Sequence, residues 1–262
     1  MNLDENKYGH INKPFPGNRG IDAGGVAVQA EGGGRNVVGL GVGVVPVYQG
    51  SSEYRTLPVP MLNYESGSFF VTPRAGLPAM GLKTRLAQDW EAGVFVGMGL
   101  NRDSSDADRL KGLDDIDYHA TYGAFVEWRP GPYALGLAYR QAAHKGYGGV
   151  MELRASYLAW RDDSNALRVG VNAEWANGDA MQTWYGVTPG QAARSRAGLH
   201  AYSPSSGFQS ASLYAAWSHQ LSARWSTVAT LGVSTVLGDA RDSPLVERDS
   251  NVFGSVGMVY AF

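Results

Sequence analysis

The chain has 262 residues, only 18% of them charged, and a net charge of -2, so composition gives no reason to expect a nucleic-acid partner. It contains no cysteine, which excludes disulfide scaffolds, zinc–thiolate sites and cysteine nucleophiles. No stretch approaches the roughly 18–20 apolar residues that a membrane-spanning helix needs. Glycine is abundant and aromatic residues make up 11% of the chain, which suits a β-barrel with a polar lumen and polar loops.

Residues 1–34 are polar, rich in Gly, Asn and Pro, and show no sustained hydrophobic period. They predict a flexible N-terminal segment, on the periplasmic side if the chain is a barrel, ahead of a single barrel domain over 35–262. Met1 is followed by Asn-Leu-Asp-Glu and not by the basic and apolar regions of a signal peptide. We interpret the chain as a mature form with an added start Met; the alternative is a cytoplasmic protein.

From Arg35 onward, apolar and polar or small residues alternate in segments that are separated by turn signals. The clearest segment is 165–175, where Leu167, Val169 and Val171 share one face with Ala173 and Trp175. About twelve such segments are expected, near 35–46, 53–64, 67–73, 76–86, 89–101, 117–129, 132–144, 149–160, 164–176, 207–219, 222–237 and 250–262. Most have the length of a tilted membrane strand, whereas strands of a soluble sandwich have about 5–6 residues.

The pattern therefore predicts an all-β fold: an antiparallel transmembrane β-barrel of the outer-membrane type with about 12 strands. Helices are the competing interpretation, but the glycines would weaken them by about 1 kcal/mol each. The second strand is the weakest, because Pro58 and Pro60 interrupt it and a proline cannot join a ladder freely. We expect this strand to be bent or to resemble an edge strand.

The final segment, Ser250 to Phe262, predicts the closing strand of the barrel. Phe262, Tyr260, Met258, Val256 and Val252 share one parity, and mostly small residues occupy the other, with Phe253 and Val259 as exceptions. The last strand of a barrel must pair with the first, because an open edge cannot lie in lipid.

Connections alternate between tight turns and longer loops. Tight turns are expected near 64–67, 86–89, 129–132, 160–164 and 219–222, and longer loops over 101–117, 176–207 and 237–250. Since outer-membrane barrels have short periplasmic turns, an even strand number puts both termini in the periplasm. Aromatic residues at the short-turn ends predict an interfacial girdle: Trp90, Trp128, Tyr133, Trp160, Trp225 and Phe262.

No motif predicts catalysis, a cofactor or a metal. Gly39-Leu-Gly-Val-Gly43 lacks the helix and the acidic residue of a dinucleotide site, and its glycines lie on one strand face. The five histidines show no metal-ligand spacing, and no nucleophile elbow occurs. Asp117 and His119 share a face and could form an acid–base dyad, although a polar lumen residue needs no catalytic role. We therefore expect no enzyme, no cofactor and no metal.

The face opposite the apolar one carries charged residues of both signs. The predicted lumen charges are Lys83, Arg85, Glu91, Glu127, Arg140, Glu152, Arg154, Arg168 and Glu174. Two interpretations stay open: a structural ion-pair network, which we favour, and a selective pore or ligand site. About eight strands leave room only for side chains and 16–18 form an open channel, so twelve predict a lumen narrowed by side chains.

Three long motifs resemble the MipA/OmpV family of MltA-interacting proteins. They are Gly39–Pro60, with the sequence GLGVGVVPVYQGSSEYRTLPVP; the WYGVT stretch from Trp184, with Gln191 and Ser195–Gly198; and Leu237–Val246, with the sequence LGDARDSPLV. The resemblance covers about 24–262. Its expected loop positions are Tyr48, Gly50, Ser51, Ser52, Tyr185, Gly186, Asp239, Asp242, Ser243 and Pro244.

The resemblance implies an outer-membrane barrel of a Gram-negative bacterium, in contact with outer-membrane lipids. It implies a scaffold that links a murein transglycosylase to a murein synthase, and it carries no catalytic residues over. The alternative function is a narrow channel, or a barrel that binds an antibiotic or peptide and affects permeability. A plugged lumen would favour the scaffold and a continuous water path the channel.

Overall fold

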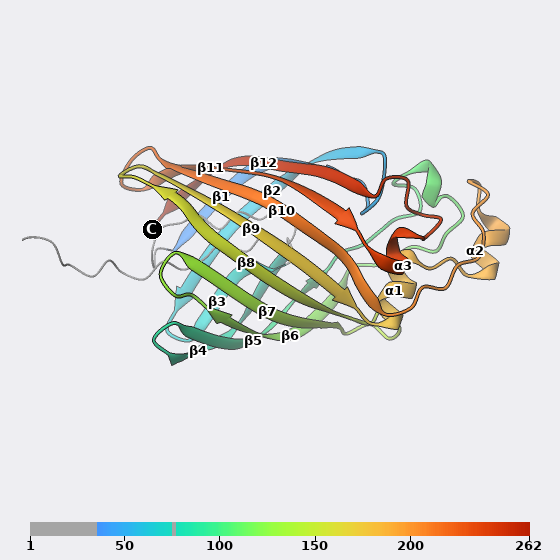
Figure 1. Cartoon of the computed structure of the whole chain (residues 1–262), viewed down its shortest axis with the longest axis horizontal. Helices are drawn as coiled ribbons and strands as arrows, with labels where there is room; N and C mark the ends of the chain where they lie inside the picture. Colours follow the sequence, from blue (N-terminus) through green and yellow to red (C-terminus); the bar gives the residue numbers. More distant parts are fainter. Residues whose placement is uncertain (1–35, 75–76) are drawn as a thin grey trace, which may run out of the picture.

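A computed structural model describes residues 36–74 and 77–262, so the N-terminal segment predicted over 1–34 lies outside the described residues. The described part forms a closed barrel of twelve strands in which sequence neighbours pair antiparallel (Figure 1). The predicted fold class and strand number are confirmed. The strands are β1 (Val37–Pro46), β2 (Tyr54–Ser66), β3 (Phe69–Arg74), β4 (Leu77–Ala87), β5 (Trp90–Gly99), β6 (His119–Trp128), β7 (Tyr133–Ala142), β8 (Gly149–Arg161), β9 (Asn165–Ala176), β10 (Gly207–Gln220), β11 (Trp225–Val236) and β12 (Ser250–Ala261).

The barrel closes where β12 pairs with β1, from Val37↔Ala261 to Val44↔Gly254. The Phe262 N–H donates to the Asn36 carbonyl at 3.0 Å and extends this seam by one bond. The closing role predicted for the last strand is therefore confirmed. The two exceptions to its alternation face the lumen: Val259 is 2% exposed and packs with Val37, and Phe253 packs against Tyr214.

Side chains alternate between the lumen and the outer surface along every long strand. On β1, Leu40 and Val42 point outward and are exposed, whereas Gly39, Gly41 and Gly43 lie on the other face. A continuous outer belt of exposed aliphatic and aromatic side chains results. This belt is what a barrel in a lipid bilayer presents to acyl chains.

Glycines make room for aromatic rings inside the barrel. Gly93 on β5 pairs with Phe125 on β6, and Phe95 pairs with Gly123. A Cβ atom built on Gly93 would lie 2.7 Å from Phe125 Cε1, and one built on Gly123 would lie 2.6 Å from Phe95 Cζ. Each ring therefore lies over a glycine of the neighbouring strand, which explains the small residues on the lumen face.

Strand β2 is long despite Pro58 and Pro60. It pairs with β1 over ten residues, including Pro60↔Leu40 and Pro58↔Val42, but with β3 over only three residues, Tyr64–Ser66. Proline is tolerated where its missing N–H would point away from a ladder, and the prolines occupy the part of β2 that has no β3 partner. The strand therefore resembles an edge strand, as predicted, only on the side that faces β3.

The two ends of the barrel differ. Short turns at 67–68, 88–89, 129–132, 162–164 and 221–224 lie at the end that carries the C-terminus (Figure 1). The aromatic residues predicted for this end lie there, and two of them, Trp90 and Trp128, stack at 5.7 Å between centroids. Longer loops occupy the other end: 47–53, 100–118, 143–148, 177–206 and 237–249.

Short helices lie in these longer loops: η1 (Asp108–Leu110), α1 (Gly178–Tyr185), α2 (Pro189–Arg194) and α3 (Gly238–Arg241). Asn177 caps α1 by accepting the Ala180 N–H at 3.0 Å, and Thr188 with Gln191 forms a capping box on α2. None of the helices in the described residues is long and apolar enough to cross a membrane.

Replacing Gly123 by Val should destabilise the barrel by about 1–3 kcal/mol or more, because the new side chain must displace both the Tyr139 carbonyl and the Phe95 ring in a packed lumen. Gly207→Val is the matched control, since no heavy atom lies within 4 Å of a Cβ built there. Urea unfolding in lipid vesicles measures both variants. Equal stability of the two variants would contradict the packing role assigned to Gly123.

Candidate functional site

The longer loops pack into a folded cap over one end of the barrel (Figure 1). Its hydrophobic core joins side chains from four loops, including Tyr48, Leu110, Val187 and Leu245. Leu110 is fully buried, and Val187 and Leu245 are 1% exposed. Loops that bury such side chains are held in one arrangement, because exposing them again costs about 1.5–3 kcal/mol each.

Tyr48 ties the first family motif to Leu245 of the last motif and to Glu247 directly after it. The Tyr48 hydroxyl donates to the Leu245 carbonyl at 3.1 Å and lies 3.1 Å from Glu247 Oε2. The same carboxylate oxygen accepts the Ser52 N–H at 3.1 Å. Burial, reinforced by the neighbouring Glu247 charge, raises the pKa of Tyr48 above its usual value.

Asn251, at the start of β12, clamps the loop that follows β1. Its Nδ2 donates to the Ser51 carbonyl at 2.8 Å, and its Oδ1 accepts the Gly50 N–H at 3.2 Å. Asn251 is 2% exposed and Ser51 is fully buried. Gly50 has a φ of +90°, and a Cβ there would lie 2.9 Å from a Val246 methyl carbon, so this position needs glycine.

The second and third motifs meet at Ser243. Its hydroxyl donates to the Tyr185 carbonyl at 2.6 Å and accepts the Leu245 N–H at 3.2 Å. The Tyr185 hydroxyl donates to Gln49 Oε1 at 2.9 Å. Since Gln49 belongs to the first motif, this bond joins the second motif to the first. The Pro244 carbonyl accepts a hydrogen bond from Arg109 Nε at 2.9 Å. Motif residues far apart in the chain thus form one interlocked unit.

The remaining motif residues lie around this unit. Asp239 accepts the Ser205 N–H at 2.9 Å, and its carbonyl accepts the Tyr202 hydroxyl at 2.7 Å. Gly186 ends α1, and Asp242 is exposed beside Arg241. These contacts make the motif residues part of the folded cap.

Arg102 is a central cap residue that sequence reasoning missed. It is 6% exposed, and its Nη1 and Nη2 donate to the Trp184 and Thr183 carbonyls at 2.5 Å and 3.4 Å. These carbonyls belong to the C-terminal turn of α1, where a cation is stabilising. Burial lowers the pKa of Arg102 to about 10, so it stays charged at neutral pH. Nothing in the sequence distinguishes Arg102 from the other loop arginines.

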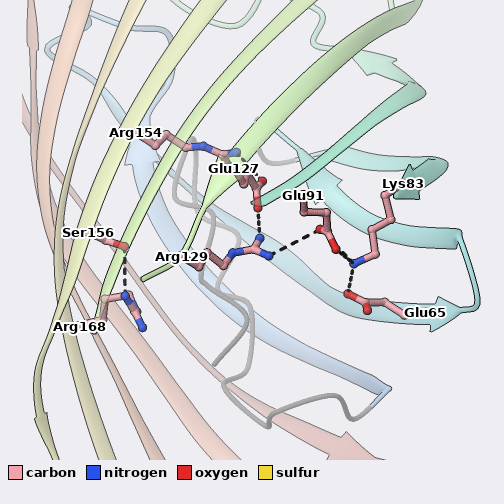
Figure 2. A network of polar contacts seen from close by, with 8 residues as sticks. All are labelled: Glu65, Lys83, Glu91, Glu127, Arg129, Arg154, Ser156 and Arg168. Atoms are coloured by element: carbon pink, nitrogen blue, oxygen red, sulfur yellow. Dashed lines mark hydrogen bonds and ion pairs between the residues drawn. The ribbon is translucent and has the colours of Figure 1, made fainter. Parts of the chain in front are cut away.

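Four of the nine predicted lumen charges, Lys83, Glu91, Glu127 and Arg154, form an ion-pair network near the short-turn end (Figure 2). Lys83 Nζ lies 2.8 Å from Glu65 and 3.2 Å from Glu91. Arg129 bridges Glu91 and Glu127, and Arg154 pairs with Glu127 at 3.1 Å. Sequence reasoning missed Glu65 and Arg129, because both lie beside turns where the alternation ends.

Arg168 lies beside this network and is 2% exposed. It donates to Ser156 Oγ at 3.2 Å (Figure 2). A second group lies nearer the cap: Arg140 pairs with Glu174 at 3.5 Å, and Gln209 donates to Glu174 at 2.8 Å. Glu152 is buried at 5% exposure, whereas Arg85 lies at the end of β4 with an exposed side chain.

Apolar side chains fill the lumen between the charged groups. Phe70, Phe95 and Phe125 form one buried cluster with Ala79 and Ala138. A cavity beside this cluster, lined by Phe95, Arg140 and Glu152 among others, has a volume of about 10 Å³. A water molecule needs about that volume. The lumen is therefore narrowed by its own side chains at this level.

The dyad considered for Asp117 and His119 does not form. His119 Nδ1 lies 2.9 Å from the backbone carbonyl of Asp117, and its ring stands edge-on to Tyr147. Within residues 36–74 and 77–262, no group of three or more His, Asp or Glu side chains could hold a metal ion.

The chain is similar to known proteins over most of its length. A family model described as MltA-interacting protein MipA matches residues 38–262. The MltA-interacting proteins of Escherichia coli (strain K12) and Shigella flexneri are each 24% identical over 246 residues, which cover 87% of this chain and 91% of the relative.

Solved structures are more distant. The CymD monoaromatic hydrocarbon channel has a TM-score of 0.43 and 7% identity, with 87% of this chain and 88% of that chain covered. OprD from Pseudomonas aeruginosa has a TM-score of 0.36 and 11% identity, with 86% and 65% covered. The barrel fold is established by the pairing of its own twelve strands.

Acid should loosen the cap through Glu247. Burial acts to raise the pKa of this carboxyl, but hydrogen bonds from Ser52 and Tyr48 outweigh it and hold the pKa below the usual 4.5. A lowered carboxyl pKa contributes stability that is complete above the ordinary pKa and is lost as pH falls through the lowered one.

Limited proteolysis of the cap between pH 7 and pH ~3 measures this effect. Glu247→Gln should raise cleavage at pH 7 and flatten the acid-induced increase. Asp242→Asn, an exposed position of the same loop, is the control and should behave as wild type. An unchanged pH profile in Glu247→Gln would show that this carboxylate does not hold the cap.

Proposed function

The chain belongs to the family of MltA-interacting proteins, and from this premise we propose that it is a non-enzymatic scaffold in the outer membrane. Its proposed partners are a murein transglycosylase and a murein synthase. The relatives from Escherichia coli and Shigella flexneri carry the name MltA-interacting protein, which supports the first partner. The outer belt of apolar side chains supports contact with outer-membrane lipids.

The observation that carries the proposal is a lumen narrowed by its own side chains beneath a folded cap. Ion pairs around Glu127 and the rings of Phe70, Phe95 and Phe125 occupy the barrel interior. A barrel whose interior is packed with its own side chains is suited to hold surfaces in place. Partner proteins then bind to the surfaces at the two ends of the barrel.

We propose the short-turn end as the periplasmic face and as the partner surface. Outer-membrane barrels have short periplasmic turns, and an even number of strands then leaves both termini on that side. Murein enzymes act on the cell wall in the periplasm, so a scaffold for them must present its contact surface there.

The turn between β8 and β9 offers a clean test of the partner surface. Asp162 organises this turn by accepting the Ser164 and Asn165 N–H groups at 2.8 Å and 2.7 Å, whereas its neighbour Asp163 is exposed. Asp163 can therefore be changed without breaking the turn. Asp117 is an exposed aspartate at the opposite, long-loop end.

Immobilised barrel should capture the purified lytic murein transglycosylase of the same organism. Asp163→Arg should weaken capture by roughly tenfold, since a like charge or clash at an interface costs more than about 1.4 kcal/mol. Asp117→Arg is the matched charge reversal and should leave capture unchanged. Loss of capture only in Asp117→Arg would place the partner at the other end. Capture no better than that of an unrelated barrel would contradict the scaffold.

Planar-bilayer conductance addresses the alternative, a narrow channel or a barrel that binds an antibiotic or peptide. Wild-type protein should insert without stepwise conductance, because the Phe95 and Phe125 rings and the Arg140–Glu174 pair narrow its lumen. Steady steps in wild type that change size in Arg140→Ala would instead support the channel and contradict a scaffold whose lumen is blocked by side chains.

A further inference from the structure

A long groove crosses the outer wall of the barrel. It has a volume of about 930 Å³ and runs over β5 to β11, reaching Ser250 at the start of β12. Strands β7 to β11 lie side by side across the near face in Figure 1. The groove is lined by outward side chains, among them Leu137, Leu153, Ala173, Ala211, Leu213 and Val233.

Small side chains at the centre of the wall form the floor of the groove. Ala173 on β9 pairs with Leu153 on β8 and with Ala211 on β10. Ala155 on β8 lies beside Leu135 of β7 in the same wall. Since the flanking leucines stand higher than the alanines, the wall is hollowed where the alanines gather.

The groove extends between the two ends of the barrel. Trp90 and Trp128, at one limit, lie next to short turns; Thr235 and Ser250, at the other, flank the loop 237–249. The outward side chains along it carry no charge. Arg154 contributes to the lining, but its guanidinium turns into the lumen to pair with Glu127. An occupant must therefore be apolar where it lies against these side chains.

The shape of the groove favours a slim occupant over a second copy of the chain. In a symmetric dimer on this surface, one hollow would face another and leave an empty volume between the two copies. The side chains that line this volume would lose dispersion contacts. An acyl chain is flexible and narrow, and it can meet side chains on the floor and on both walls. Lipid also surrounds a membrane barrel at high concentration, so mass action favours it.

The tryptophan pair marks the end at which a lipid head would lie. The Trp90 and Trp128 rings stack at the short-turn rim, and Trp90 is 43% exposed. Tryptophan rings favour the headgroup level of a bilayer, where the indole N–H can donate to a polar lipid group.

We propose that this groove is a specific lipid site that holds one acyl chain of a bilayer phospholipid. The chain comes from the leaflet at the short-turn end. Its glycerol region lies beside Trp90 and Trp128, and its tail lies over Ala155, Ala173 and Ala211. The assigned leaflet rests on the proposed periplasmic orientation of the short-turn end. The site is distinct from the proposed partner surface at the turns, so lipid retention and partner capture can fail separately.

Barrel refolded in vesicles of palmitoyl-oleoyl phosphatidylethanolamine, then extracted in mild detergent, should retain bound lipid in native mass spectrometry. Ala173→Trp fills the floor of the groove and should abolish this retention. Ala229→Trp is the matched control, since Ala229 pairs with Trp217 and Val256 outside the groove lining. It should retain lipid as wild type does.

A difference in gel migration between unheated and heated samples shows that a variant is folded. Ala211→Phe replaces Ala173→Trp if the latter does not fold. Equal lipid retention in wild type, the groove variant and Ala229→Trp would overturn the proposal. So would a dimer mass in wild type that Ala173→Trp removes, because the occupant would then be a second copy. In protein purified from native membranes, retained lipid A in place of phospholipid would overturn the assigned leaflet.

Discussion

Backbone hydrogen bonding in an apolar medium is the constraint on which the rest of this structure depends. Inside a bilayer no water satisfies an open strand edge, so the sheet must close on itself. The β1–β12 seam closes it, and the Phe262–Asn36 bond extends the closure beyond the last strand pair. Strand β2 obeys the same constraint in another way. Part of this strand has no β3 partner, and Pro58 and Pro60 lie there, so it has fewer N–H groups that need one.

Closure also determines what the lumen contains. Alternation sends every second residue of each strand inward, and twelve strands leave too little room for large side chains at all these positions. The pairing of Phe95 with Gly123 and of Phe125 with Gly93 resolves this crowding across neighbouring strands. Charged groups share the same interior, and those around Glu127 lie there as ion pairs, because an isolated buried charge is too costly.

Sequence could predict the strands because their signal is local. A period of two over ten residues identifies β9 from residues 165–175 alone, and the fold class follows from its repetition. The cap could not be predicted in the same way. Asn251 clamps Ser51 across 200 positions, and Tyr48 meets Leu245 across 197. Family motifs marked Tyr48, Ser51 and Leu245 but not Asn251, and only the fold brings these residues together. Arg102 carried no local signal at all.

Besides the narrowed interior, the barrel has three surfaces for interaction: the cap, the turns and the outer wall. The cap is tied together by Ser243, Asn251 and Glu247, so its face is presented in one fixed shape. The turns are short and held by groups such as Asp162, which also makes them rigid. On the outer wall, the small side chains of Ala173 and Ala211 leave a hollow that lipid must fill. Each surface is rigid because closure fixes the strands beneath it, and a rigid wall with preformed surfaces costs little conformational entropy when a partner binds.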